Sequence, residues 1–364
     1  MSLKATGVNA VGAGLAGSLL AILLARRGCQ VTVYERRGDP RLANADSGRS
    51  INLALAARGI RGLQRAGVLD PVMQFAIPMR GRMVHEHDGG AALQPYGVRP
   101  EEVIYSVDRG TLNRTLIDAA AAYPNVQLKF RQLCLGLAPG KNTLEFRDEE
   151  SGRIYVAAAQ PSIATDGAGS AVRDALLARE VAQVREEPLD HDYKELTIPA
   201  VDGRPALEVN ALHIWPRGGF MLIALPNPDA TFTATLFLAR QGENSFEQLT
   251  SADAVEAFFT REFPSARALM PDLRREFFEH PQGSLGTVYT RSWHLDGDVC
   301  LLGDAAHAIV PFHGQGMNCA FEDCVELDHL MDEHHGWHGL FEAFEHARRP
   351  NTDAIARMAL ENYV

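Results

Sequence analysis

The 364-residue chain lacks a long hydrophobic run, paired cysteines and any repeat or low-complexity segment. Its longest apolar stretch, residues 15–25, is too short to span a bilayer. The five cysteines are odd in number and form no Cys-x-x-Cys pair, which argues against a disulfide framework and a zinc site and fits a reducing compartment. We therefore predict a cytoplasmic protein with no metal and no membrane segment in this chain.

A concentrated positive charge is also missing. The net charge is −11, and the only basic groupings are isolated doublets such as residues 26–27, 36–37 and 348–349. Such a chain repels phosphate backbones, so a nucleic-acid partner is excluded. The length predicts about two domains with ample core.

The first 35 residues predict a strand, a glycine-rich turn, a helix, a second strand and then an acidic residue. This order is the pattern of a dinucleotide-binding unit. Gly12 permits the tight turn, Gly14 lets the backbone approach a pyrophosphate, and Gly17 lets the helix pack close to the strand. The helix N-terminus offers unpaired N–H groups to the phosphates. Glu35 ends the second strand, where its carboxylate can accept hydrogen bonds from the ribose and disfavours the 2′-phosphate of NADP.

Two later segments favour FAD over NAD as the bound nucleotide. In the first, an apolar strand leads into a turn of small residues at Asp166-Gly167. In the second, a buried strand brings Asp304 to its carboxyl end, where a ribityl hydroxyl could be bound. A glycine loop then begins a helix whose N–H groups can face the flavin and stabilise its reduced anion. That helix begins with Gly316, Met317 and Asn318.

Together, the N-terminal glycines, Asp166-Gly167 and Gly303-Asp304 resemble the flavoprotein aromatic hydroxylases of the para-hydroxybenzoate hydroxylase type. The three motifs stand in the order of that family. One departure is Ala164-Thr165, where the family usually has Gly-Ala. The resemblance implies bound FAD, and NADPH as a transient co-substrate without a Rossmann domain of its own.

The segments between these motifs resemble the kynurenine-hydroxylating branch of the family over essentially the whole chain. They are residues 48–56, 79–85, 93–97, 211–216, 310–318 and 359–363. The resemblance implies that L-kynurenine is converted to 3-hydroxykynurenine through a flavin C4a-hydroperoxide, with NADPH and O2 consumed, in tryptophan catabolism.

The same resemblance implies roles for single residues. Arg82 and Tyr96 would hold the amino-acid carboxylate, and Asn362 would contact the same end. The implied loop between flavin and substrate contains Phe312, His313 and Gln315, and the implied FAD contacts are Glu35, Arg36, Arg109 and Asp304. An arginine beside a tyrosine hydroxyl is by itself a natural carboxylate clamp. Arg80, one strand period from Arg82, is the competing candidate.

The predicted fold is α/β (α+β), with a discontinuous Rossmann-like FAD-binding domain and an antiparallel substrate-binding sheet. The FAD domain is assigned residues 1–75, 100–180 and 275–325, the substrate domain 76–99 and 181–274, and a C-terminal helical segment 326–364. The strand pair carrying Arg82 and Tyr96 joins the antiparallel meander, which places substrate between the domains. After Gly316 the pattern is helical, with interruptions near Gly336 and Pro350.

Three questions stay open. A flavin hydroxylase of another aromatic carboxylate would share the FAD residues and differ at Arg82, Tyr96, His213 and Asn362. A non-catalytic FAD-binding protein would bind flavin without oxidising NADPH in response to aromatics. His313 has capping or packing as the alternative to proton transfer, whereas His307 is expected to be structural.

The end of the chain gives a further expectation. Family members normally continue past the helix bearing Asn362, so we expect a shortened form with an open substrate pocket, weak kynurenine affinity and a high fraction of peroxide per NADPH. The expected partners are small molecules, with a homodimer as one possible assembly.

Overall fold

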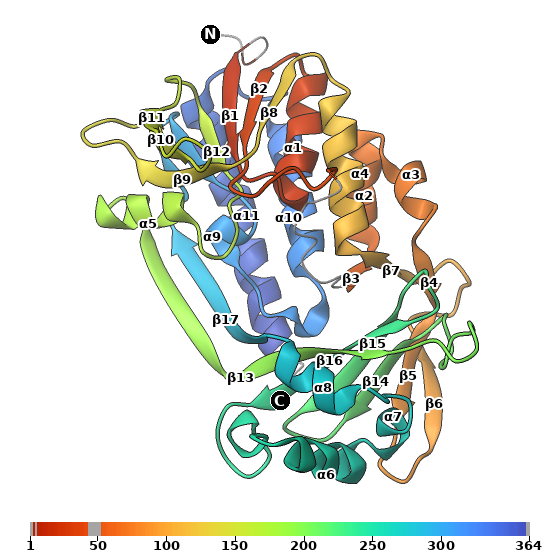
Figure 1. The fold of residues 1–364 in the computed structure, drawn as a ribbon. Helices are drawn as coiled ribbons and strands as arrows, with labels where there is room; N and C mark the ends of the chain where they lie inside the picture. The colour runs from red at the N-terminus through yellow and green to blue at the C-terminus, as the bar shows by residue number, and fades with distance from the viewer. Residues whose placement is uncertain (1–2, 4–5, 43–51, 362–364) are drawn as a thin grey trace.

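The computed structural model describes residue 3 and residues 6–42 and 52–361. Two large sheets lie at opposite ends of the molecule, joined by two long strands and the last helix (Figure 1). The upper sheet in that view has the order β18-β19-β12-β1-β2-β8. Its strands are β1 (Gly7–Val11), β2 (Gln30–Tyr34), β8 (Val126–Lys129), β12 (Ser162–Ala164), β18 (His294–Leu295) and β19 (Val299–Leu301).

The first strand-helix-strand unit follows from its apolar residues and its glycines. Strand β1 is buried from Val8 to Val11, as a parallel strand covered on both faces should be. Helix α1 (Leu15–Arg26) is buried without a break from Gly17 to Ala25. The chain leaves the helix through Gly28, whose φ of 86° suits a residue without a Cβ. Strands β1 and β2 then pair in parallel, as the sequence predicts.

The lower sheet has the order β17-β13-β16-β15-β14-β5-β6. Strands β14 (Leu212–Pro216), β15 (Met221–Pro226) and β16 (Phe232–Ala239) form the predicted antiparallel meander. Strand β5 (Gly81–His85) pairs in parallel with β14, and β6 (Ala91–Pro95) forms the edge, so the strand bearing Arg82 joins this sheet as expected. The long strands are β13 (Gln183–Ile198) and β17 (Gln282–Arg291). Strand β17 comes from the 275–325 segment and pairs with β13.

Two three-stranded sheets and the shorter helices complete the described part of the chain. The sheets are β11-β10-β9 and β3-β7-β4. Their strands are β3 (Asn52–Leu55), β4 (Ile77–Met79), β7 (Ile104–Asp108), β9 (Gln132–Leu137), β10 (Leu144–Asp148) and β11 (Ile154–Val156). The helices are α2 (Ala57–Ala66), α3 (Leu69–Met73), α4 (Arg109–Ala121), α5 (Ala171–Ala178), α6 (Ala252–Glu262), α7 (Pro264–Arg267), α8 (Leu273–Glu279) and α9 (Asp304–His307), with 3₁₀ turns at Phe246–Gln248 and Pro311–His313.

Two long helices follow the last strand, α10 (Gly316–Leu330) and α11 (Trp337–Glu361). The predicted break near Gly336 is confirmed, whereas the one near Pro350 is wrong because α11 continues through that proline. Arg348 and Thr352 are buried on either side of it, so packing outweighs the one lost backbone hydrogen bond. None of the helices described is both long and apolar enough to cross a membrane.

Among the residues that the structure describes, three apolar clusters hold these parts together. The largest lies between the upper sheet and its covering helices, and the second between the lower sheet and α6 to α8. The third is small and joins the two ends: it contains Phe237 of β16, Leu285 of β17, Val310 and Ala359 of α11. Phe312 packs against this third cluster. The loop that precedes α10 therefore meets the lower sheet at this point.

Candidate flavin and substrate site

The glycine turn after β1 has the geometry that its spacing predicts. Gly12 has a φ of 94°, and its N–H donates to the Tyr34 carbonyl at 2.7 Å. A Cβ on Gly17 would lie 1.9 Å from the Gly12 oxygen, so only glycine fits there. A Cβ on Gly14 would meet nothing within 4 Å. The space in front of Gly14 is thus open to a ligand, and helix α1 points its N-terminus toward it.

Thr165, the departure from the family pattern, fastens this turn. Its hydroxyl donates to the Val11 carbonyl at 2.7 Å and lies 3.2 Å from the Gly12 carbonyl. The hydroxyl therefore ties the strand β12 end to the glycine loop rather than obstructing it. The sequence offered no signal for this contact, because it joins residues more than 150 positions apart.

Glu35 is oriented by the backbone around it. One carboxylate oxygen accepts from the Ala13 N–H at 2.8 Å, and the other accepts from the Arg37 N–H at 2.9 Å. Each oxygen keeps a second lone pair for a ribose hydroxyl. Arg36, beside it, is exposed.

The two aspartates of the later motifs both have free acceptor capacity. Asp166 is held through one oxygen by the Val172 N–H at 3.5 Å, and its other oxygen is buried without a hydrogen bond among the described residues. Burial raises the pKa of Asp166. A buried acceptor without a donor is costly, so this oxygen fits a ligand that donates to it.

Asp304 follows a buried strand, yet its own side chain is accessible to solvent. Its neighbours on both sides are buried, while its own side chain is exposed. The surrounding protein raises its pKa by removing water, and His307 and Arg109 lower it, which places both cations nearby. A Cβ on Gly316 would lie 3.9 Å from its Oδ1. The fold therefore brings Asp304, Arg109 and the start of α10 together around an accessible carboxylate.

The loop before α10 is fixed by Asn318, which is fully buried. Its side-chain oxygen accepts from the Ala56 N–H at 2.9 Å, and its amide donates to the carbonyls of Ala54 and Gly314 at 2.8 Å each. The Phe312 ring meets Phe237 edge-on at 5.3 Å. His313 ends the 3₁₀ turn between these two anchors. Gln315 accepts from Arg58 at 3.5 Å.

Beneath Gly303-Asp304, the fully buried Asp323 of α10 collects three donors. It accepts from the Gly303 N–H at 3.1 Å, from His307 at 2.6 Å and from Arg348 of α11 at 2.6 Å. Burial alone would raise the pKa of Asp323, but the two cations more than reverse this and lower it. His307 is therefore structural, as expected. Sequence reasoning missed Asp323, whose only signal is an acid on the buried face of an amphipathic helix.

Arg82 and Tyr96 lie together at the edge of the lower sheet. The guanidinium carbon of Arg82 lies 5.9 Å from the Tyr96 ring centre, and Arg82 is exposed. Burial raises the pKa of Tyr96, and Arg82 opposes that rise. Arg80 is exposed and accepts through its carbonyl from the Tyr96 N–H at 3.0 Å. Asn362 lies outside the described residues.

His213 of β14 is buried behind Arg82 and pairs with His85 of β5, which sequence reasoning missed. The Nε2–H of His213 donates to the Glu208 carbonyl at 2.8 Å, so its Nδ1 is the acceptor for His85 Nε2–H at 2.8 Å. The His85 ring stacks on Trp215 at 4.1 Å. Burial lowers the pKa of both histidines, that of His85 to about 4. Both are neutral at pH 7.

Solved structures share the fold of this chain. The chain is similar to the tetrameric form of 2-methyl-3-hydroxypyridine-5-carboxylic acid oxygenase, with a TM-score of 0.79, 20% identity and coverage of 98% of this chain and 90% of that one. It is also similar to P. aeruginosa PqsL in complex with 2-aminobenzoylacetate, with a TM-score of 0.75, 19% identity and coverage of 97% and 94%. At these identities the likeness shows the fold alone.

Sequence comparison is more specific. The profile of the FAD binding domain family matches residues 5–359. A kynurenine 3-monooxygenase from Xanthomonas euvesicatoria pv. vesicatoria is 53% identical over 97% of this chain and 78% of its own length. One from Myxococcus xanthus is 49% identical over 98% and 77%. With the flavin-type site described above, these matches show that the chain belongs to the kynurenine 3-monooxygenase family of FAD-binding hydroxylases.

Proposed function

We propose that this chain is an FAD-dependent monooxygenase that converts L-kynurenine to 3-hydroxykynurenine, using NADPH and O2. The 53% identity to a kynurenine 3-monooxygenase over 97% of the chain carries the proposal. The Arg82–Tyr96 pair supports it from the structure, because it offers a cation and a hydroxyl side by side on an open sheet edge.

The residues present fit FAD. The open space at Gly14, the orphaned oxygen of Asp166 and the accessible carboxylate of Asp304 are features that a nucleotide with a pyrophosphate and sugar hydroxyls would complete. We assign its contacts to Gly12, Gly14, Gly17, Glu35, Arg36, Arg109, Asp166, Asp304, Gly316, Met317 and Asn318. Bound FAD would supply the redox chemistry, taking electrons from NADPH and activating O2.

The chain's own residues bind and orient the substrate. Arg82, with Tyr96 and Asn362, would hold the amino-acid carboxylate by charge-assisted hydrogen bonds. The amino group of kynurenine activates its own ring, so the reaction demands no strong protein base. The task left to Phe312, His313 and Gln315 is to line the reacting end and exclude water. Phe312 suits this role because it bridges the loop and the lower sheet.

The decisive experiment measures NADPH and O2 consumption by the FAD-loaded protein with and without L-kynurenine, and identifies the product. We expect L-kynurenine to accelerate both rates and to yield 3-hydroxykynurenine. A response to hydroxybenzoates in its place would identify a hydroxylase of another aromatic carboxylate. Bound flavin with no response to any aromatic would overturn the proposal in favour of a non-catalytic protein.

Three further predictions concern the whole molecule. We propose that the upper sheet and its helices form the FAD-binding domain and that the lower sheet carries the substrate. A homodimer stays a prediction that light scattering of the purified protein would test. A cytoplasmic location likewise awaits fractionation of cells that express the chain.

A further inference from the structure

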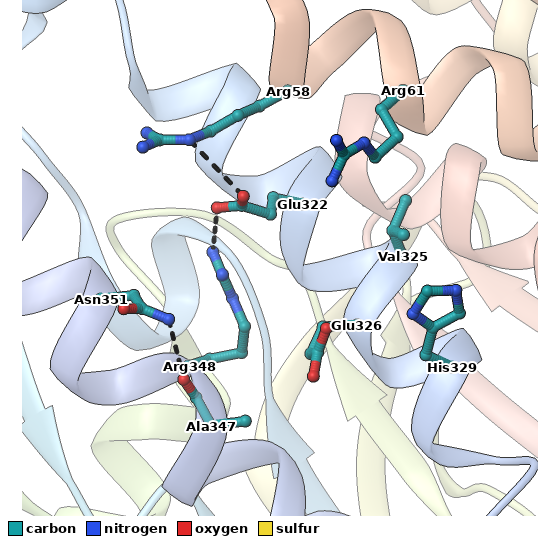
Figure 2. A pocket seen from close by; sticks show the side chains of 9 residues that line it. All are labelled: Arg58, Arg61, Glu322, Val325, Glu326, His329, Ala347, Arg348 and Asn351. Carbon is teal, nitrogen blue, oxygen red and sulfur yellow. Dashed lines mark hydrogen bonds and ion pairs between the residues drawn. The ribbon is translucent and has the colours of Figure 1, made fainter.

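A polar pocket lies on the flank of the flavin side, between α2, α10 and α11 (Figure 2). Its volume is about 230 Å³. Its walls are formed by Arg58 and Arg61 of α2, Glu322, Val325, Glu326 and His329 of α10, and Ala347, Arg348 and Asn351 of α11. Arg348 also binds Asp323 and Arg58 reaches Gln315, but none of the lining residues is assigned above to FAD or to the substrate. We propose that this pocket binds a phosphate group.

The charges in the pocket leave one cation without a partner. Arg348 forms an ion pair with Glu322 at 2.9 Å, and Arg58 lies 3.5 Å from the same carboxylate. Arg61 makes no ion pair or hydrogen bond within the described part of the chain, and Figure 2 shows its guanidinium directed into the pocket, toward Glu322 and Val325. Arg348 is also paired with the buried Asp323 at 2.6 Å, so the positive charge that the pocket can offer a ligand is that of Arg61, with Arg58 one helical turn away.

A phosphate suits this arrangement better than a cation or an apolar ligand. Arginine recognises phosphate oxygens through its planar fork of N–H donors, and Arg61 and Arg58 present such forks from neighbouring turns of one helix face. The imidazole of His329 and the amide of Asn351 add donors from the two other helices. Glu326, which has no cationic partner among the described residues, weakens the attraction and offers a way to measure it.

The pocket adjoins the loop that precedes α10. Arg58 reaches Gln315 at 3.5 Å, and Arg348 binds Asp323, which in turn binds the Gly303 N–H. A phosphate held here could come from the dinucleotide co-substrate or from a free phosphate compound. The first source rests on the proposed function, whereas direct binding of phosphate does not require turnover, so the two failures are distinguishable.

The test titrates the FAD-loaded protein with inorganic phosphate and separately with 2′,5′-ADP, the phosphorylated half of NADPH, by calorimetry at constant ionic strength. Arg61→Gln should weaken binding at least tenfold, and Glu326→Gln should tighten it about threefold. Arg204→Gln, at an exposed arginine on another part of the surface, is the matched control and should change nothing.

The two ligands identify the source. If the co-substrate supplies the phosphate, 2′,5′-ADP binds more tightly than inorganic phosphate, and Arg61→Gln raises the KM for NADPH while leaving that for NADH unchanged. If a free phosphate compound is the ligand, inorganic phosphate binds and both KM values stay the same. The proposal is overturned if neither ligand gives saturable binding, or if Arg61→Gln and Glu326→Gln shift affinity in the same direction.

Discussion

The two ends of the molecule shift the pKa values of their buried histidines in opposite directions. Near the flavin motifs, His307 is buried against Asp323 at 2.6 Å, and this carboxylate more than offsets burial, so the pKa of His307 is raised. Behind Arg82, His85 and His213 donate in sequence to a backbone carbonyl, and burial lowers the pKa of both. One end is thus a charged network and the other a neutral relay.

The difference reflects what each end must hold. Asp323 binds the backbone N–H of Gly303, so the charged network fixes the main chain next to Asp304. The neutral relay lies within the lower sheet and adds no positive charge behind Arg82, whose cation is left for a substrate carboxylate. At the flavin end the buried histidine network therefore holds the main chain in place, whereas at the substrate end the buried histidines hold one another.

Removing the centre of the charged network should have the largest effect. Asp323→Ala leaves His307 buried without its anion and Arg348 with Glu322 alone, and we expect a loss of about 3–5 kcal/mol in the free energy of unfolding. Denaturant unfolding measures this, and FAD retention should fall with it because Gly303 loses its anchor. Asp332→Ala, which breaks an exposed ion pair of Arg27, is the control and should have little effect. Equal losses in both variants would refute the central role of Asp323.

Substitutions at the two ends should affect different ligands. Arg82→Ala should weaken kynurenine binding by about 2–5 kcal/mol, the scale for removing one member of a charge pair that binding desolvates, while FAD stays bound. Asp304→Ala should instead reduce flavin retention. Kynurenine titration and the visible absorption spectrum measure the two effects. An unchanged dissociation constant would exclude Arg82 from the clamp, and a fully yellow Asp304→Ala protein would exclude Asp304 from FAD binding.

The flavin end was largely predictable from the sequence because its parts are local. Gly12, Gly14 and Gly17 stand within six residues, and their spacing alone dictates a tight turn and a close helix. The order of the motifs and the strand alternation in the lower sheet also predicted both large sheets.

The contacts that could not be predicted join segments far apart in the sequence. His85 meets His213 only because β5 pairs with β14, across 128 positions. The contacts of Asp323 with α9 and α11, and those of Thr165 with β1, depend on packing in the same way. Proline normally interrupts a helix, but at Pro350 tertiary packing outweighs this local preference and α11 continues.

Substituting two glycines of the same motif should affect different properties, the stability of the protein in one case and FAD binding alone in the other. Gly17→Ala places a Cβ 1.9 Å from the Gly12 oxygen, so we expect a loss of about 2–3 kcal/mol in unfolding free energy together with loss of FAD. Gly14→Ala meets no protein atom within 4 Å and should leave the stability of the FAD-free protein unchanged while weakening FAD binding. Thermal unfolding of the FAD-free forms and flavin fluorescence titration separate the outcomes. A destabilised Gly14→Ala apoprotein would contradict this division.

Acid should destabilise the substrate end through the neutral relay. The pKa of His85 is about 4 in the folded protein and about 6.5 when unfolded, so its contribution is fully present above pH 6.5 and is lost as the pH falls toward 4. We expect about 1–2 kcal/mol, allowing for screening by solvent. His307 acts with the opposite sign, since its raised pKa makes its contribution fade as the pH rises above 6.5.

Urea unfolding of single variants, measured across this pH range, separates the contributions of the two histidines to stability. His85→Gln should flatten the acid side of the stability profile, and His307→Gln the alkaline side. His87→Gln, at an exposed residue in the turn that follows β5, is the control and should leave the profile intact. An acid limb that persists in His85→Gln would assign it to other groups.

The smallest effect concerns Thr165, where the chain departs from its family. Thr165→Val keeps the shape of the side chain and removes the hydroxyl that donates to the Val11 carbonyl at 2.7 Å, so we expect a loss of about 1 kcal/mol in unfolding free energy. Thr143→Val is the matched control, because the Thr143 hydroxyl is buried without a partner in the described chain and its removal should cost nothing. If the two variants are equally stable, the Thr165 hydroxyl does not fasten the glycine turn, and the flavin end depends on its glycines alone.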